Sequence, residues 1–123
     1  MKVKAQTYQH QTKQEWDINK EDMDIFEQIF FTEVRLGIAH HMKKKDKRDK
    51  TWWNLYKAVK QKETDISIYD IKALSEFAKE FLEVEKFRLK KNGSYTKENF
   101  RRNFVAINVV EAYLIDELKE KRR

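Results

Sequence analysis

The 123-residue chain contains no cysteine, no proline and only two glycines. The lack of cysteine excludes disulfide bonds and thiolate metal sites, and it is compatible with a reducing compartment such as the cytoplasm. The scarcity of glycine and proline favours long helices joined by short loops. No apolar run approaches the roughly 18 residues that span a bilayer, and the N-terminus lacks the apolar block of a signal peptide. We therefore expect a cytoplasmic protein with no membrane partner.

Charged residues are plentiful, and their balance is basic. Lys and Arg number 27 against 21 Asp and Glu, so the formal net charge is +6. An excess of this sign suits an acidic partner, either nucleic acid or an acidic protein surface. A chain of this length can bury one core without cross-links, so we predict a single domain.

The most apolar stretch runs from Phe104 to Ile115. One stripe at helical spacing comprises Phe100, Phe104, Ile107, Leu114 and Leu118. A second stripe, on another side, comprises Val105, Val109 and Ala112. A helix that is apolar nearly all round is buried on most sides, so we predict the central helix here. The second stripe also suits pairing with another chain, so we expect a homodimer or a subunit of a larger complex.

Two earlier helices begin with the same local signal. Asn19 can cap the first helix, with Asp22 three residues later, and this helix should continue to about Met42. Ser67 can cap the third helix in the same way, with Asp70 three residues later. Each pattern satisfies backbone N–H groups that have no partner inside the helix, so both starts are strong predictions.

The remaining boundaries follow from turn residues and spacing. The third helix should place Ser75 on its solvated face and end at Asn92-Gly93, and Thr96 should cap the last helix. A shorter second helix is expected from about Thr51 to Lys62. Four helices joined by short loops most often pack in alternating directions, so we predict an all-α, four-helix up-down bundle.

The N-terminal region differs from the rest. Residues 1–17 are polar and Gln-rich, with a loose alternation at Val3, Ala5 and Tyr8. We expect a polar arm here that is flexible or forms one short edge strand. Residues 18–123 then make up the single helical-bundle domain.

Charge is unevenly distributed along this scaffold. Residues 15–27 have a net charge of −5 and residues 63–70 a net charge of −3, whereas residues 43–50 and 86–102 have +4 and +6. Acids therefore open the first and third helices and bases close them, as helix dipoles favour. In an up-down bundle the first and third helices are parallel, so both basic segments should also meet at one end, which we call the basic pole.

A basic pole of this kind suits phosphate groups. Trp52 and Trp53 follow the first basic segment, and they cannot both face the core, so one of them can stack on a base. The predicted nucleic-acid contacts are Lys43, Lys44, Lys45, Lys47, Arg48, Lys50, Trp52, Trp53, Lys90, Lys91, Arg101 and Arg102.

Residues suited to catalysis are few. The histidines are His10, His40 and His41, and no metal-ligand spacing surrounds them, so we expect no metal and no cofactor. No glycine-rich phosphate loop is present either.

One short segment resembles a known family. Arg35-Leu36-Gly37-Ile38-Ala39-His40-His41 is similar to the Arg-x4-His motif of HEPN-superfamily ribonucleases, some of which also end the motif in Ala-His-His. The resemblance implies metal-independent RNA cleavage by the 2′-hydroxyl, often at a dimer interface, with Arg35 and His40 in the site. On a continuous helix these two side chains point about 140° apart, so they can cooperate only across a break, which Gly37 could allow, or between two chains.

These observations lead to three functional hypotheses. The first is a small basic helical module that binds nucleic acid through the basic pole without catalysis. The alternative is a protein-interaction module, such as an inhibitor, adaptor or assembly subunit, that docks on a protein partner. The third is an HEPN-like ribonuclease that uses Arg35 and His40.

Overall fold

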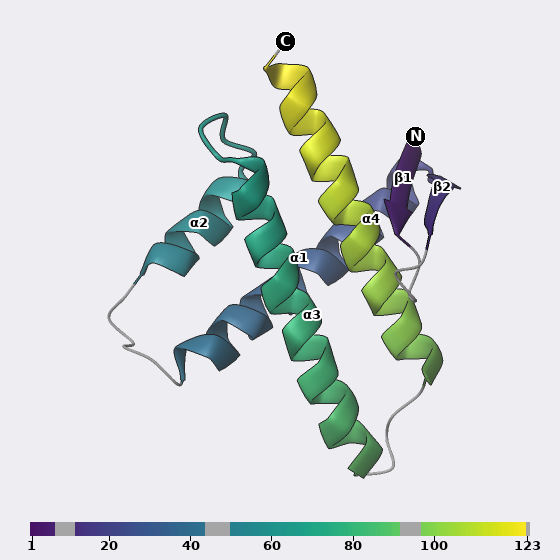
Figure 1. Cartoon of the computed structure of the whole chain (residues 1–123), viewed down its shortest axis with the longest axis vertical. Coiled ribbons are helices and arrows are strands. Elements are labelled where there is room, and N and C mark those ends of the chain that lie inside the picture. Colours follow the sequence, from purple (N-terminus) through teal and green to yellow (C-terminus); the bar gives the residue numbers. More distant parts are fainter. Residues whose placement is uncertain (7–11, 44–49, 92–96, 123) are drawn as a thin grey trace.

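The computed structural model describes residues 1–6, 12–43, 50–91 and 97–122 (Figure 1). These residues form β1 (Lys2–Gln6), β2 (Lys13–Asp17), α1 (Lys20–Met42), α2 (Thr51–Lys60), α3 (Ile68–Lys91) and α4 (Lys97–Lys121). The predicted mostly helical fold with four helices is therefore confirmed. No helix within the described ranges is both long and apolar enough to cross a bilayer.

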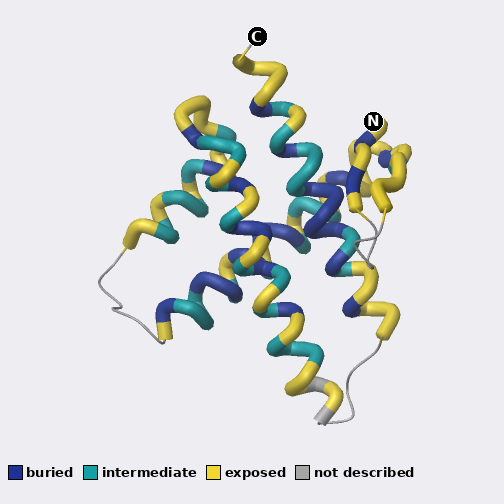
Figure 2. The backbone as a smooth tube through the Cα atoms, viewed as in Figure 1, coloured by how far each residue is buried: buried dark blue, intermediate teal, exposed yellow. Residues whose placement is uncertain are grey.

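The helices pack around a core where α1 meets both of the long C-terminal helices. Figure 1 shows α3 and α4 running in opposite directions, with α1 crossing behind them and α2 beside α1 and α3. The buried residues concentrate around this crossing (Figure 2). Fully buried side chains from three helices meet there, namely Phe30, Val34, Ile38, Ile71, Leu74, Ile107 and Val110. The central position predicted for the last helix is confirmed.

The first and third helices are not parallel, contrary to our prediction. Figure 1 shows α1 crossing behind α3 at an angle. Gly37 and His41 of α1 both lie against Phe77 of α3, so the two helices cross near Phe77. The prediction failed because short loops do not fix the angle at which two helices cross.

A glycine sets how closely α1 and α3 approach. A Cβ atom on Gly37 would lie 2.7 Å from the carbonyl carbon of Phe77, which is closer than real contacts allow. α1 continues through this residue without interruption from Lys20 to Met42. Gly37 therefore serves close helix packing and does not break the helix.

The predicted helix starts are present. The side chain of Asn19 accepts a hydrogen bond from the backbone N–H of Asp22 at 2.8 Å. At the start of α3, Ser67 Oγ accepts from Asp70 N at 3.1 Å, and Asp70 Oδ2 accepts from Ser67 N at 2.8 Å. This reciprocal pair forms a capping box. The predicted cap Thr96 lies outside the described residues.

The N-terminal arm forms a hairpin. β1 and β2 pair antiparallel, with Val3 opposite Trp16, and Val3 and Ala5 are buried. The strand expected at Val3 and Ala5 is confirmed, and the second strand was not predicted. Tyr8 lies outside the described residues.

This hairpin packs on the second apolar stripe of α4. β1 contacts α4, and the Asn108 side chain donates from Nδ2 to the backbone oxygen of Gln6 at 3.3 Å. Val109 is fully buried, and Val105 and Ala112 are partly buried against the core. The stripe that suggested a dimer is therefore largely covered within one chain.

Polar groups bridge α3 and α4 in the interior. Ser75 is fully buried, although its position on α3 predicted exposure. Its Oγ donates to Glu111 Oε2 at 2.8 Å, and Lys79 Nζ lies 3.6 Å from the same oxygen. A small hydroxyl can be buried where a carboxylate accepts its hydrogen, which helical periodicity alone does not reveal.

Candidate nucleic-acid interface

The described parts of the two basic segments that we expected to form one pole lie at different places. Figure 1 shows the C-terminal end of α1 at one side of the molecule and the end of α3 at its foot. Lys43 and Lys50 are exposed, whereas Lys44, Lys45, Lys47 and Arg48 lie outside the described residues. The described ends of the two segments are therefore apart, and the predicted pole depends on residues 44–49, which lie outside the described residues.

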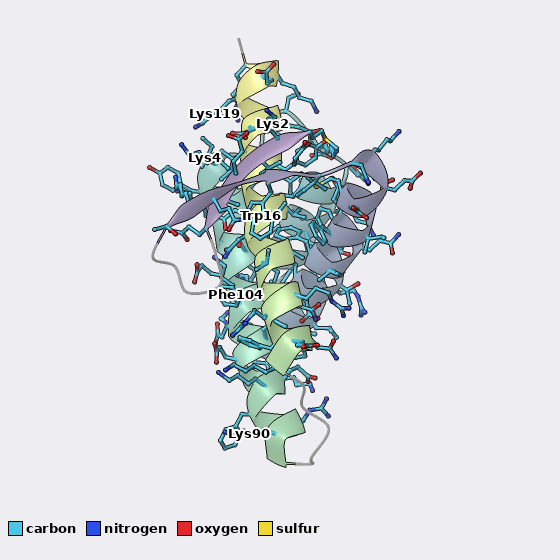
Figure 3. All side chains as sticks on the ribbon, turned by 90° about the vertical axis from the view of Figure 1, so that its right-hand side faces the viewer. Lys2, Lys4, Trp16, Lys90, Phe104 and Lys119 are labelled. Atoms are coloured by element: carbon cyan, nitrogen blue, oxygen red, sulfur yellow. The ribbon has the colours of Figure 1, made fainter. Side chains whose placement is uncertain are left out.

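The second basic segment forms a compact corner where α3 ends and α4 begins. We call this surface the α3–α4 corner and define it by exposed or half-exposed cations of both helices, namely Lys86, Arg88, Lys90, Lys97, Arg101 and Arg102. The two helices contact each other beside this surface, where Lys86 Nζ of α3 lies 4.8 Å from the ring centroid of Phe100 of α4. Lys91 is the last residue of α3. Figure 3 shows Lys90 at this foot of the molecule.

An exposed aromatic side chain accompanies these cations. Phe87 is 76% exposed and lies one helical turn before Lys90. By contrast, Trp52 and Trp53 are half-buried, and the ring of Trp52 lies 4.8 Å from that of Phe77. The residue available for stacking is therefore Phe87, which we did not predict. A helical projection of α3 could have found it, because Phe87 falls opposite the buried side of Leu74 and Ala78.

The cations of the corner differ in what they contact. Arg88 lies 2.9 Å from Glu85, and Lys86 lies 3.8 Å from Glu83, so both already have acidic partners. Within the described ranges, Lys90, Lys97 and Arg102 have no ion pair or hydrogen bond through their side chains. Their charge is therefore available to a partner.

Helix dipoles explain only half of the corner. The C-terminal end of a helix carries partial negative charge, so bases in the last turns of α3 are stabilised there. The N-terminal end carries partial positive charge, yet α4 begins with Lys97, Arg101 and Arg102 against only Glu98. The resulting positive potential favours an anion at the start of α4.

The residues of the HEPN-like segment lie on different sides of α1. Arg35 is exposed and lines a shallow groove with Tyr56 and Lys60 of the α2 region. The rings of His40 and His41 instead face α3, at 6.2 Å from Phe81 and 4.9 Å from Phe77. Because α1 is continuous, Arg35 and His40 do not meet within one chain.

Other chemistry-bearing groups are scattered. In the part of the chain that the structure describes, no three His, Asp or Glu side chains gather as a metal site would require. Among the described residues, the carboxyl with the largest shift is that of Glu33, because burial and the nearby Glu85 raise its pKa to about 7. Glu33 belongs to α1 and Glu85 to α3.

Comparison of the chain with models of known protein families, with characterised proteins and with solved structures finds no match.

Proposed function

We propose that the protein binds nucleic acid, without catalysis, through the α3–α4 corner. The cations of the corner contact phosphates, and Phe87 stacks on a base. This proposal keeps the predicted contacts Lys90, Arg101 and Arg102. It moves the stacking role from the tryptophans to Phe87, because that ring is 76% exposed.

The observation that carries the proposal is the cluster of cations at the start of α4. Lys97 in the first turn adds its charge to the positive end of the helix dipole, and Arg101 and Arg102 in the next turn extend the same positive surface, which suits an anion. Backbone N–H groups at a helix start also suit phosphate oxygens. The bases at the end of α3 extend the same positive surface towards Phe87.

Exposed Phe87 favours single strands over duplexes. A base in a single strand can leave its neighbours and stack on an aromatic ring, which contributes about 1–3 kcal/mol per base. A duplex offers phosphates to the same cations but keeps its bases paired. The exposed residues Lys43, at the end of α1, and Lys50, at the start of α2, supply further contacts for longer strands.

The test compares single-stranded and duplex oligonucleotides by fluorescence anisotropy across a salt series. Arg101→Ala with Arg102→Ala should weaken both by about tenfold or more and reduce the salt slope by up to about 0.7 per lost phosphate contact on single strands. Phe87→Ala should weaken single strands by roughly 5- to 100-fold and change duplex binding little.

A matched control removes the same charge elsewhere. Lys20 and Lys57 are exposed on α1 and α2, so Lys20→Ala with Lys57→Ala should leave the affinity within about twofold of wild type. If the control variant lost as much affinity as the corner variant, the effect would come from net charge alone and not from the α3–α4 corner. Undetectable binding of DNA and RNA at about 50 mM salt would reject the proposal.

A further inference from the structure

The outer edge of β1 has backbone groups that point away from the hairpin. Met1 and Ile18 exchange both backbone hydrogen bonds, at 2.8 and 2.9 Å, so they form a hydrogen-bonded pair. Such pairs alternate along an antiparallel ladder, so Val3 and Ala5 also bond to β2, and the N–H and C=O groups of Lys2 and Lys4 point outward. Gln6 is the next alternate residue along β1, and its backbone oxygen also points outward, since it accepts a hydrogen bond from the Asn108 side chain.

This edge borders a cleft in the side of the molecule. The cleft has a volume of about 320 Å³ and lies between β1, the start of α3 and the C-terminal half of α4. Its wall includes half-buried apolar side chains, namely Ile68, Ala112 and Ile115. Figure 3 shows the hairpin lying across α4, with Lys4 and Lys119 near this end of α4 and Lys90 at the opposite end.

The charge of the cleft is mostly positive. Lys4, Lys13, Lys72 and Lys119 line it and are exposed, and within the described ranges their side chains make no ion pair or hydrogen bond. Two acids also line it, but Glu111 is already held by Lys79 and Ser75. The cleft therefore combines an open strand edge, an apolar wall and several lysines without acidic partners.

We propose that this cleft binds an extended acidic segment of a partner protein, which adds to the outer edge of β1 as a third strand. Successive side chains of an added strand point to opposite faces. One set would lie over Ala112 and Ile115, and the other would lie beside Lys4, so the segment alternates apolar and acidic residues. This surface is separate from the α3–α4 corner and does not depend on the function proposed there.

Two features favour an acidic peptide over the other possible occupants. The β1 edge of a second copy would bring Lys2 and Lys4 against the same lysines, and like charges opposed across strands are destabilising. A nucleic acid could meet the lysines, but it has no strand backbone to pair with the N–H and C=O groups of Lys2 and Lys4.

The test uses a fluorescein-labelled seven-residue peptide that alternates glutamate and valine, with binding followed by anisotropy. Two N-methylated forms, each blocked at alternate residues, present one hydrogen-bonding edge and block the other. Strand addition predicts that one form loses at least tenfold in affinity while the other stays within about threefold of the parent. Equal affinities of the two forms, or no binding of the parent peptide, would overturn the proposal.

Protein variants test the same edge from the other side. Lys4→Ala removes one charge and should weaken binding about twofold to threefold, whereas Lys4→Pro also removes the outward N–H and should weaken it about fivefold more. Proline is tolerated there because that N–H does not serve the hairpin. Since the N-methylated peptides leave the protein unchanged, the proposal stays testable if Lys4→Pro unfolds the hairpin.

Two further measurements separate this site from the nucleic-acid interface. Arg101→Ala with Arg102→Ala should leave peptide affinity within about twofold of wild type. A single-stranded oligonucleotide should not displace the labelled peptide at equal charge concentration. Displacement would overturn the proposal by showing a general polyanion cleft, whatever the result at the α3–α4 corner.

Discussion

Two pairs of glutamates on the helices have opposite electrostatic surroundings. Glu27 of α1 and Glu117 of α4 share a lysine, Lys62, which lies between α2 and α3. Glu33 of α1 and Glu85 of α3 have no lysine between them in the described part of the chain. The fold therefore neutralises the first pair of acids with a lysine and leaves the second pair without one.

Lys62 holds the first pair together. Its Nζ lies 3.1 Å from Glu117 and 3.7 Å from Glu27, and it lies 5.5 Å from the ring centroid of Tyr113. Burial raises the pKa of Glu27, but Lys62 opposes the rise. A hydrogen bond to Glu117 raises the pKa of Tyr113 to about 12. Lys62 has a positive φ of 57°, a backbone conformation that usually favours glycine. The ion pairs of its side chain offset the conformational cost of this backbone.

The second pair lacks such a bridge. Oε2 of Glu33 is buried and has no hydrogen-bond partner among the described residues. Burial, followed by repulsion from Glu85, raises the pKa of Glu33 to about 7. Glu85 itself is paired with Arg88 at 2.9 Å. The cations of the nearby α3–α4 corner therefore do not neutralise the closest buried acid, which agrees with their proposed role towards an external anion.

Removing the bridge should have the largest effect. Lys62→Met keeps the apolar stem and the non-glycine backbone but leaves Glu27 and Glu117 to repel each other, so the free energy of unfolding at pH 7 should fall by about 1–2 kcal/mol. The loss should shrink at acidic pH, because burial raises the pKa of Glu27 and protonation of this carboxylate removes the repulsion. Urea denaturation at the two pH values measures both effects. Lys90→Met, at the corner, should change the free energy of unfolding by less than about 0.5 kcal/mol. A loss as large as that of Lys62→Met would contradict the difference between the two lysines.

The unbridged pair should show its effect in the pH dependence of stability. The pKa of Glu33 is about 7 in the folded protein and 4.5 in the reference state, so the folded state holds a proton that the unfolded state releases. Wild-type stability should therefore fall as pH rises from about 4.5 to 7. Glu33→Gln should match wild type near pH 4 and exceed it at pH 8 by about 1 kcal/mol, a figure reduced for partial solvent screening.

A charge reversal sharpens this prediction. Glu85→Lys places a cation beside Glu33 and should lower the pKa of that carboxyl towards or below 4.5, which removes the fall in stability. Loss of the exposed pair with Arg88 should cost little. NMR titration of the Glu33 carboxyl, compared with urea denaturation, distinguishes this result from a general loss of stability. An unchanged pKa would show that Glu85 does not act on Glu33.

Local signals were read correctly from the sequence. Asn19, Ser67 and Asp70 act within a few residues of themselves, so their caps did not depend on the rest of the fold. Val3 and Ala5 predicted a strand for the same reason. The second strand, Lys-Gln-Glu-Trp-Asp, lacks a regular alternation and is defined by its pairing with β1.

Features that depend on distant contacts were missed. The crossing of α1 and α3 at Gly37 places the ends of these two helices apart, and no pattern within α1 indicates the close approach of Phe77. The second apolar stripe of α4 suggested a dimer because the hairpin that covers it is far away in sequence. The basic residues of the α3–α4 corner were identified, because they are close together in the chain. The cleft beside β1 combines four segments, from β1, β2, α3 and α4, and could not be predicted from any one of them.

Substitutions in the HEPN-like segment of α1 should have the smallest effects on stability and binding. Arg35 is two residues after Glu33 but lines the groove near Tyr56 and does not contribute to the raised pKa of Glu33. Arg35→Ala should therefore leave that pKa unchanged and alter stability by less than about 0.5 kcal/mol. His40→Ala removes a ring contact with Phe81 and should lower the free energy of unfolding by about 1 kcal/mol.

The Arg35→Ala and His40→Ala variants should both bind single-stranded RNA within about twofold of wild type, with no cleavage in EDTA. Metal-independent cleavage that disappears in either variant would instead favour a ribonuclease, and its site would need a second chain because Arg35 and His40 face different sides of one continuous helix.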